Sequence, residues 1–314
     1  MNRQTTAIAR LEPAREVVSR VLDFGELVNE FLESQDIRAI SKEVYRKGLE
    51  RFFGWLTANE IRQPDRKDIL RFKTYLQEAG LTANTVNSYL IGVRRFFAFL
   101  EASRLYPDVA KTIKGVKQTN GHLRETPTLA QAQEILSRID TASITGKRDF
   151  ATVNLMLRTG LRTCELTRAN IEDIRQQAGE ALLFVQGKGR DSKDEFVLLT
   201  EKALRPIMGY LEARGKASPE APLFVSHSDR NPGERLTTRT IRGVSKFYLR
   251  KIGLNKKQLS AHSFRHFFAT QSLKAGAPLL QVKESMRHAS IETTQGYLHN
   301  LDRIEQAAER FIDF

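Results

Sequence analysis

Apolar residues recur at helical spacing from Phe24 to about Ser103. Four successive segments each place their apolar positions three or four residues apart, which gathers them on one helix face. Ser41 and Thr82 are residue types that cap helix N-termini, and Gly80 is typical of the position after a C-terminus. The apolar stripes are Leu27, Phe31 and Leu32; Tyr45, Leu49, Phe52, Phe53 and Leu56; Ile69, Phe72, Tyr75 and Leu76; and Val86, Leu90, Val93, Phe97 and Leu100. No strand pattern interrupts them, so the sequence predicts a compact four-helix unit.

The next segment, residues 104–124, loses this periodicity. It carries five Lys or Arg residues against one acid, together with Pro107, Gly115 and Gly121. This composition is typical of an extended basic linker, which would lie along a polyanion. A solvated connector would have the same composition, and the residues alone leave both interpretations open.

A second unit begins near Thr126, where Thr128 and Gln131 have the spacing of a capping box. Two short apolar runs, 181–185 and 195–199, then flank a polar, glycine-rich stretch, which is the pattern of a β-hairpin. Helical periodicity resumes at Thr200. The sequence therefore predicts a mainly α protein whose second domain contains a small antiparallel sheet. We expect an extension over 1–22, a helical domain over 23–103, a basic linker over 104–125 and the second domain over 126–314.

Length and composition narrow the class of protein. A chain of 314 residues suits two domains. No apolar run approaches the ~20 residues of a membrane-spanning helix, and the N-terminus lacks the apolar stretch of a signal peptide. The one cysteine, Cys164, excludes an internal disulfide and a cysteine-rich metal site. The net charge of +13 favours a polyanionic partner, with nucleic acid ahead of an anionic membrane surface.

Two basic side chains of the second unit follow glycines. Arg162 comes two residues after Gly160, and Glu165 lies three residues further on, where it can hold the guanidinium. Lys188 lies between two glycines of the expected hairpin turn, which would let a loop carry its ammonium onto a phosphate. Taken singly, both side chains are more typical of a solvated surface.

The remaining chemistry lies nearer the C-terminus. His262 and Arg265 are three residues apart at the start of an apolar helix, so both project from one face. A His beside an Arg is costly to bury there unless the pair meets an anion. His288 follows another short helix and precedes Tyr297, although a lone Tyr is usually a packed aromatic with a polar tip.

Together these side chains describe a phosphate cage. Two arginines would neutralise non-bridging phosphate oxygens, and two histidines would donate hydrogen bonds to the developing charge. A tyrosine would supply the nucleophile and a lysine the proton donor. The members are Arg162, Arg265, His262, His288, Tyr297 and Lys188. A metal site is the competing interpretation of the histidines, but no carboxylate or Cys lies at ligand spacing near them.

With this set of residues, the chain resembles the tyrosine recombinases, also called the phage integrase family. The resemblance spans about residues 24–314 and rests on the ordered set of motifs: Thr-Gly-Leu-Arg-x-x-Glu-Leu at Arg162, Gly-Lys-Gly at Lys188, His-x-x-Arg at His262, and a His nine residues before Tyr297. One departure stands out, because the family usually has Leu-Gly before the second His and this chain has Met286-Arg287. Only about 22 residues precede the first expected helix, so we expect no arm-binding N-terminal domain and a similarity to simple Xer-like and mobile-element integrases.

The resemblance implies a fold, a reaction and partners. The first unit would be a SAM-like core-binding domain and the second a catalytic domain, the two gripping DNA as a C-shaped clamp. Tyr297 would form a 3′-phosphotyrosyl bond, Lys188 would protonate the 5′ leaving oxygen, and strands would be exchanged through a Holliday junction within a homotetramer. No metal or other cofactor is expected, and the location would be the bacterial cytoplasm, on the nucleoid. The DNA-binding candidates are Arg46, Lys47, Arg51, Lys111, Lys114 and Lys117.

Other functions compete with this one. A type IB topoisomerase uses similar residues without recombining two sites, a degenerate relative would bind DNA without cleaving it, and a basic membrane-surface protein would lack the cage. The C-terminal tail carries an apolar stripe that either packs on its own domain or, as the resemblance implies, docks on a neighbouring subunit as an exchange helix. The stripe consists of Leu301, Ile304, Ala308 and Phe311.

Overall fold

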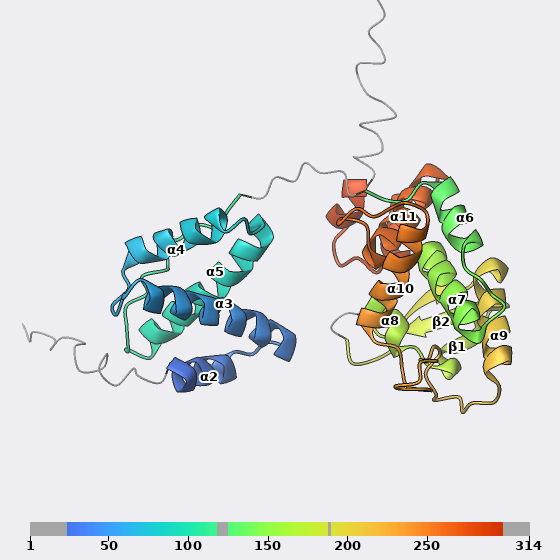
Figure 1. The fold of residues 1–314 in the computed structure, drawn as a ribbon, viewed down its shortest axis with the longest axis horizontal. Coiled ribbons are helices and arrows are strands. Elements are labelled where there is room, and N and C mark those ends of the chain that lie inside the picture. The colour runs from blue at the N-terminus through green and yellow to red at the C-terminus, as the bar shows by residue number, and fades with distance from the viewer. Residues whose placement is uncertain (1–23, 118–124, 188–189, 298–314) are drawn as a thin grey trace, which may run out of the picture. The chain divides into compact units, whose positions relative to one another are not determined.

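A computed structural model describes residues 24–117, 125–187 and 190–297 of the chain (Figure 1). The chain divides into two compact units, Met1–Gly121 and His122–Phe314. The predicted N-terminal extension, Lys188 and the tail stripe from Leu301 to Phe311 lie outside the described residues. Within the described residues, every helix is too short or too polar to cross a membrane.

The first unit is the predicted set of four helices: α2 (Phe24–Ser34), α3 (Ala39–Ala58), α4 (Arg66–Glu78) and α5 (Ala83–Ala102). Thr82 caps α5 as expected, since its hydroxyl accepts from the backbone N–H of Thr85. Ser41 does not cap α3. The helix begins two residues earlier, because the carbonyl of Arg38 already accepts from the N–H groups of Ser41 and Lys42.

An aromatic core holds this unit together. Phe31, Phe52, Phe72 and Phe96 are fully buried, and Phe52 meets Phe72 edge-on with ring centroids 5.0 Å apart. Helices α3 and α5 approach closely at Gly48, where an added Cβ would lie 3.0 Å from the Cα of Tyr89. The apolar stripes of the sequence thus become a single buried core.

Much of the segment expected to be a linker packs on the helical unit instead. Ala110 and Ile113 are buried in its core, and Leu105, Tyr106 and Val116 pack against it. The Asn87 side chain also binds both the N–H and the carbonyl of Val116, at 2.7 and 3.0 Å. These apolar side chains have a surface to cover, which explains why residues 105–116 do not extend away as a solvated chain.

The second unit is mainly helical with a three-stranded antiparallel sheet. Its helices are α6 (Leu129–Ser137), α7 (Ile144–Thr159), α8 (Thr163–Arg168), α9 (Glu201–Arg214), α10 (Thr238–Lys251), α11 (Ala261–Lys274) and α12 (Leu279–Ser285), with a short 3-10 turn, η1 (Ile171–Asp173). The predicted hairpin is confirmed: β2 (Glu180–Val185) pairs with β3 (Glu195–Leu198), Leu183 opposite Val197. Strand β1 (Ile174–Gln177) was not predicted, because it is short, polar and largely exposed.

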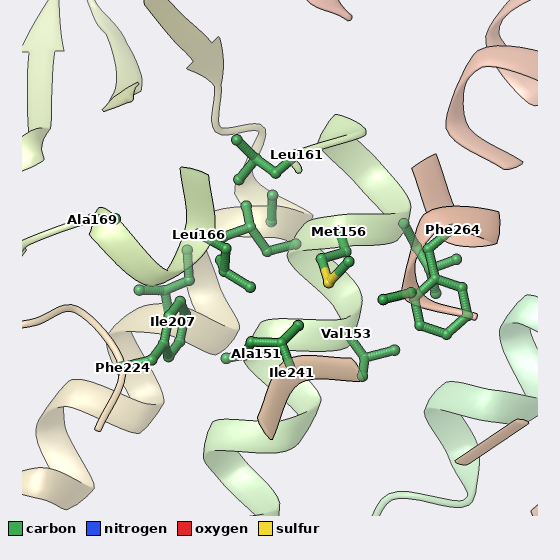
Figure 2. Packing of buried hydrophobic residues seen from close by; sticks show 14 of the residues in the cluster. Ala151, Val153, Met156, Leu161, Leu166, Ala169, Ile207, Phe224, Ile241 and Phe264 are labelled. Carbon is green, nitrogen blue, oxygen red and sulfur yellow. The ribbon is translucent and has the colours of Figure 1, made fainter. Parts of the chain in front are cut away.

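Helix α7 is the centre of this unit's core. Eleven of its sixteen residues are buried, and α9 and α11 pack against it. Figure 2 shows Ala151, Val153 and Met156 of α7 among Ile207, Ile241 and Phe264 from α9, α10 and α11. Because α7 is surrounded, its C-terminal end is held firmly, and the first candidate site residues follow directly from it.

Candidate active site

A glycine turn joins α7 to the first candidate arginine. Gly160 ends α7 in the left-handed conformation, with φ of 62°, which a Cβ disfavours. A Cβ there would also lie 2.6 Å from the Phe268 ring and 2.8 Å from the Met286 sulfur. The turn therefore lets α11 and the residues before His288 close onto the segment that carries Arg162.

Arg162 stands at the start of α8 and is bound to Glu165. Its Nη1 donates to Glu165 Oε1 at 2.7 Å, and its backbone N–H donates to Oε2 at 2.8 Å. Glu165 is completely buried, whereas the Arg162 side chain keeps 23% of its surface exposed. The carboxylate thus orients a guanidinium that still reaches solvent.

Arg265, from α11, is among the largest fully buried side chains, with 2% of its surface exposed. Its Nη1 donates to the carbonyl of Gly160 at 2.5 Å, and its Nη2 donates to the carbonyl of Met286. One guanidinium therefore ties the end of α7 to the turn after α12. His262, three residues earlier on the same helix, is exposed, whereas Arg265 is buried.

The turn at Met286 and Arg287 presents two successive carbonyls to the two arginines. The Met286 carbonyl accepts from Arg265 Nη2, and the Arg287 carbonyl accepts from Arg162 Nη2 at 2.9 Å. Arg287 adopts a φ of 50°, a left-handed conformation that non-glycine residues rarely use. Its side chain turns back onto Glu165, where Nη2 lies 2.7 Å from Oε2 and Nε lies 3.3 Å from Oε1.

Tyr297 lies between two histidines. Its hydroxyl contacts Nδ1 of His266, and its ring stacks on His288 with centroids 6.2 Å apart. His288 Nδ1 lies 2.8 Å from the hydroxyl of Thr294, which is itself buried. The Tyr297 ring packs on a small apolar cluster of Ala269, Val282 and Met286, so α11 and α12 hold it beside the arginines.

The site is strongly cationic, and its pKa values reflect this. Burial lowers the pKa of Arg265 to about 9, with further lowering from Arg162 and Arg287. Burial, then Arg265 and Arg162, lower the pKa of His288 to about 4, so this ring is neutral at neutral pH. Burial opposes ionisation of Glu165, but Arg287 and Arg162 outweigh it and keep its pKa below the usual range. An anion entering here would relieve the repulsion among the arginines.

Most of the predicted set is brought together. Arg162, Glu165, Arg265, His288 and Tyr297 are joined by the contacts above, although they come from segments more than a hundred residues apart. His262 reaches the group through His266, with ring centroids 4.4 Å apart. Lys188 falls outside the described residues.

Two members of this group were missed in the sequence. His266 directly follows Arg265 and is one helical turn from His262, which was a usable signal, but it was not singled out beside the apolar residues Phe264, Phe267 and Phe268. Arg287 was noticed only as a departure from the family, because nothing local indicates that it binds a residue 122 positions away.

The DNA-binding candidates lie in the first unit at or near its surface. Arg46 donates to Asn29 at 3.0 Å, Lys47 pairs with Glu43 at 3.2 Å, and Arg51 lies over the Tyr75 ring. Lys111 lies 3.8 Å from Glu101. Lys114 and Lys117 are exposed. Exposed pairs of this kind are weak, so they leave the charges available to an anionic partner.

Known proteins match both units. Residues 127–303 match the phage integrase family, and residues 27–104 match the N-terminal SAM-like domain of phage integrases. The tyrosine recombinase XerD of Listeria innocua is 30% identical over 88% of this chain and 94% of its own. The tyrosine recombinase XerC of Pelobacter propionicus is 30% identical over 85% of this chain and 87% of its own.

Solved structures agree on the fold. The XerH site-specific recombinase, in a post-cleavage complex with its palindromic difH substrate, aligns with a TM-score of 0.73 at 20% identity, covering 94% of this chain and 88% of that one. The Tn1549 transposon integrase, in complex with transposon right end DNA, aligns with a TM-score of 0.64 at 15% identity, covering 95% and 100%.

The matches of both units place this chain among enzymes of DNA strand transfer. The chain belongs to the phage integrase family. It is a tyrosine recombinase similar to the Xer proteins, and its activity is site-specific recombination. The predicted family and fold class are therefore confirmed, and the relatives favour a recombinase over the topoisomerase and non-catalytic alternatives.

Proposed function

We propose that Tyr297 is the nucleophile of this recombinase. Its hydroxyl oxygen attacks a scissile DNA phosphate, the bond from phosphorus to the 5′ oxygen breaks, and a 3′-phosphotyrosyl link and a free 5′ hydroxyl result. A 5′ hydroxyl from another strand reverses the step and joins the strands through a Holliday junction. The covalent link conserves the energy of the broken bond, so the exchange needs no separate energy source.

Each neighbouring side chain has a proposed part. Arg162, held by Glu165, and Arg265 neutralise the non-bridging phosphate oxygens, and His288 and His262 donate hydrogen bonds to them. His266 takes the proton of Tyr297, since its Nδ1 contacts that hydroxyl. Lys188 protonates the departing 5′ oxygen. The contact between Tyr297 and His266, adjacent to Arg265, is the observation that carries this proposal.

The two domains, the basic side chains of the first unit and the C-terminal tail also have proposed parts. In this proposal residues 23–103 form the core-binding domain, residues 126–314 the catalytic domain, and the charges at Arg46, Lys47, Arg51, Lys111, Lys114 and Lys117 meet the DNA backbone. The substrate is double-stranded core-site DNA with inverted repeats, bound by a homotetramer on the nucleoid. The tail beyond Asn300 docks on a neighbouring subunit, so its deletion should leave single-site binding intact and reduce recombination.

Trapping the covalent intermediate tests the proposal. In a core-site duplex nicked next to the cleavage position, attack releases a short fragment that carries the new 5′ hydroxyl, so the strand cannot be rejoined. The phosphotyrosyl product therefore accumulates and migrates slowly on a denaturing gel. Wild-type protein is expected to give this band. Tyr297→Phe should bind the duplex with equal affinity and give none, because only the hydroxyl is removed. A covalent band from the Phe variant would contradict the assignment.

A further inference from the structure

Arg287 stands where the family usually has glycine, and its guanidinium is almost fully buried. Its side chain keeps 2% of its surface exposed, and its partner Glu165 keeps none. The two Glu165 oxygens together accept four hydrogen bonds: two from the Arg287 guanidinium and two from Arg162, one of them from its backbone. Glu165 therefore shares its single negative charge between two arginines.

The charges of the cluster follow from these contacts. Arg162, Arg265 and Arg287 contribute three positive charges and Glu165 one negative charge, while the low pKa of His288 keeps that ring neutral. The cluster thus carries two net positive charges. A phosphodiester carries one negative charge and its pentavalent transition state two, so the described cluster matches the transition state. With glycine at position 287 it would carry one positive charge, because Glu165 would neutralise Arg162 alone.

We propose that Arg287 is a positioning residue that occupies Glu165, so that Arg162 keeps its charge for the scissile phosphate. The main chain of Arg287 acts in the same direction, since its carbonyl holds Arg162 Nη2 and fixes the plane of the guanidinium. Arg287 acts through Arg162 and need not touch the DNA. This inference rests on the proposed cleavage reaction and assigns a part in it to a residue outside the family's motif.

Arg287→Gly tests the inference with little backbone cost, because glycine adopts a φ of 50° readily. Single-turnover cleavage should slow at least about tenfold, equivalent to ~1.4 kcal/mol of transition-state stabilisation. The double variant Glu165→Gln with Arg287→Gly removes both charges and restores two net positive charges, so it should cleave faster than Arg287→Gly alone. Arg138→Ala, which breaks an exposed arginine–glutamate pair with Glu134, is the matched control and should cleave normally.

A change of substrate separates charge from packing. A methylphosphonate at the scissile position replaces one charged oxygen by a methyl group, so its transition state carries one negative charge instead of two. The defect of Arg287→Gly should shrink several-fold on this substrate. An equal defect on both substrates, a double variant slower than Arg287→Gly, or wild-type cleavage by Arg287→Gly would each overturn the inference.

The experiments distinguish a failure of this inference from a folding defect and from a failure of the proposed function. If Arg287→Gly does not fold, the double variant decides: cleavage within about tenfold of wild type supports the inference, and slower cleavage overturns it. A wild-type protein that forms no phosphotyrosyl complex contradicts the proposed function and this inference together. Cleavage by wild type with no effect of Arg287→Gly contradicts the inference alone.

Discussion

Replacing Arg265 by methionine should remove most of the cleavage activity while the catalytic unit stays folded. Methionine is close to arginine in length and apolar, so it fills the space between α7 and α12 without a charge. The guanidinium is the only group lost, and it serves two carbonyls and, in our proposal, the scissile phosphate. The perturbation therefore separates what Arg265 contributes to folding from what it contributes to chemistry.

The expected change in stability is small because two large effects oppose each other. The carbonyls of Gly160 and Met286 each lose a donor, which costs roughly 1–3 kcal/mol apiece, or ~2–6 kcal/mol together. Against this, burial and the neighbouring arginines lower the pKa of Arg265 from 12.5 to about 9, so holding its charge in the fold costs ~5 kcal/mol. The two effects cancel to within a few kcal/mol. Cleavage has no such compensation and should fall ~10²–10³-fold.

Two measurements on the full chain test this. Single-turnover cleavage reports the chemistry, and amide hydrogen exchange along α11 reports the stability of the catalytic unit. The chain's one tryptophan, Trp55, lies in α3 of the first unit, so its fluorescence should be unchanged and serves as an internal control. Phe264→Ala, a fully buried neighbour on α11, should instead accelerate exchange, since such truncations cost ~3–5 kcal/mol.

Either of two results would contradict this prediction. Exchange along α11 as fast in Arg265→Met as in Phe264→Ala would mean that Arg265 holds the fold together. Cleavage within about tenfold of wild type would mean that its charge does not meet the transition state.

Three further predictions concern the leaving group, acid and salt. Lys188→Ala should cleave normal DNA slowly and recover on a substrate with sulfur as the 5′ bridging atom, because a thiolate leaves without a proton; equal defects would exclude Lys188 as the acid. The folded-state pKa of His288, about 4, lies below its ordinary 6.5, so between these pH values the unfolded chain binds a proton that the folded chain does not, and the free energy of unfolding should fall from pH 6.5 toward 4. His288→Asn should weaken that fall in acid unfolding curves. An unchanged fall would contradict the lowered pKa of His288. Replacing Lys111, Lys114 and Lys117 by Ala should flatten the slope of log K against log salt by up to about three times 0.9, whereas an unchanged slope would show that these charges do not meet DNA.

The spacing of apolar residues was enough to predict most elements. Four helices and the mainly α class follow from the helical periodicity of apolar residues, and the hairpin follows from two short apolar runs on either side of a polar, glycine-rich stretch. Strand β1 could not be predicted in this way, because Arg175, Gln176 and Gln177 are polar and exposed, and only their pairing with β2 makes them a strand. The packing of residues 105–116 could not be predicted either, because Ala110 and Ile113 show no helical or strand pattern, and their burial depends on the helical unit they cover.

The candidate site, too, was predicted in part from local sequence and depends in part on the tertiary structure. Sequence by itself determined which side chains we propose for the chemistry, apart from His266 and Arg287, because motif order at Arg162, Arg265 and Tyr297 requires no knowledge of the fold. Only the tertiary structure decided how they are partnered: Tyr297 meets His266, and Arg287 takes Glu165 from a position 122 residues away. Such pairs depend on where α8, α11 and the turn after α12 converge in space. Electrostatic interactions act between neighbours in space, whatever their separation along the chain, and so the charge of the site was set by the fold.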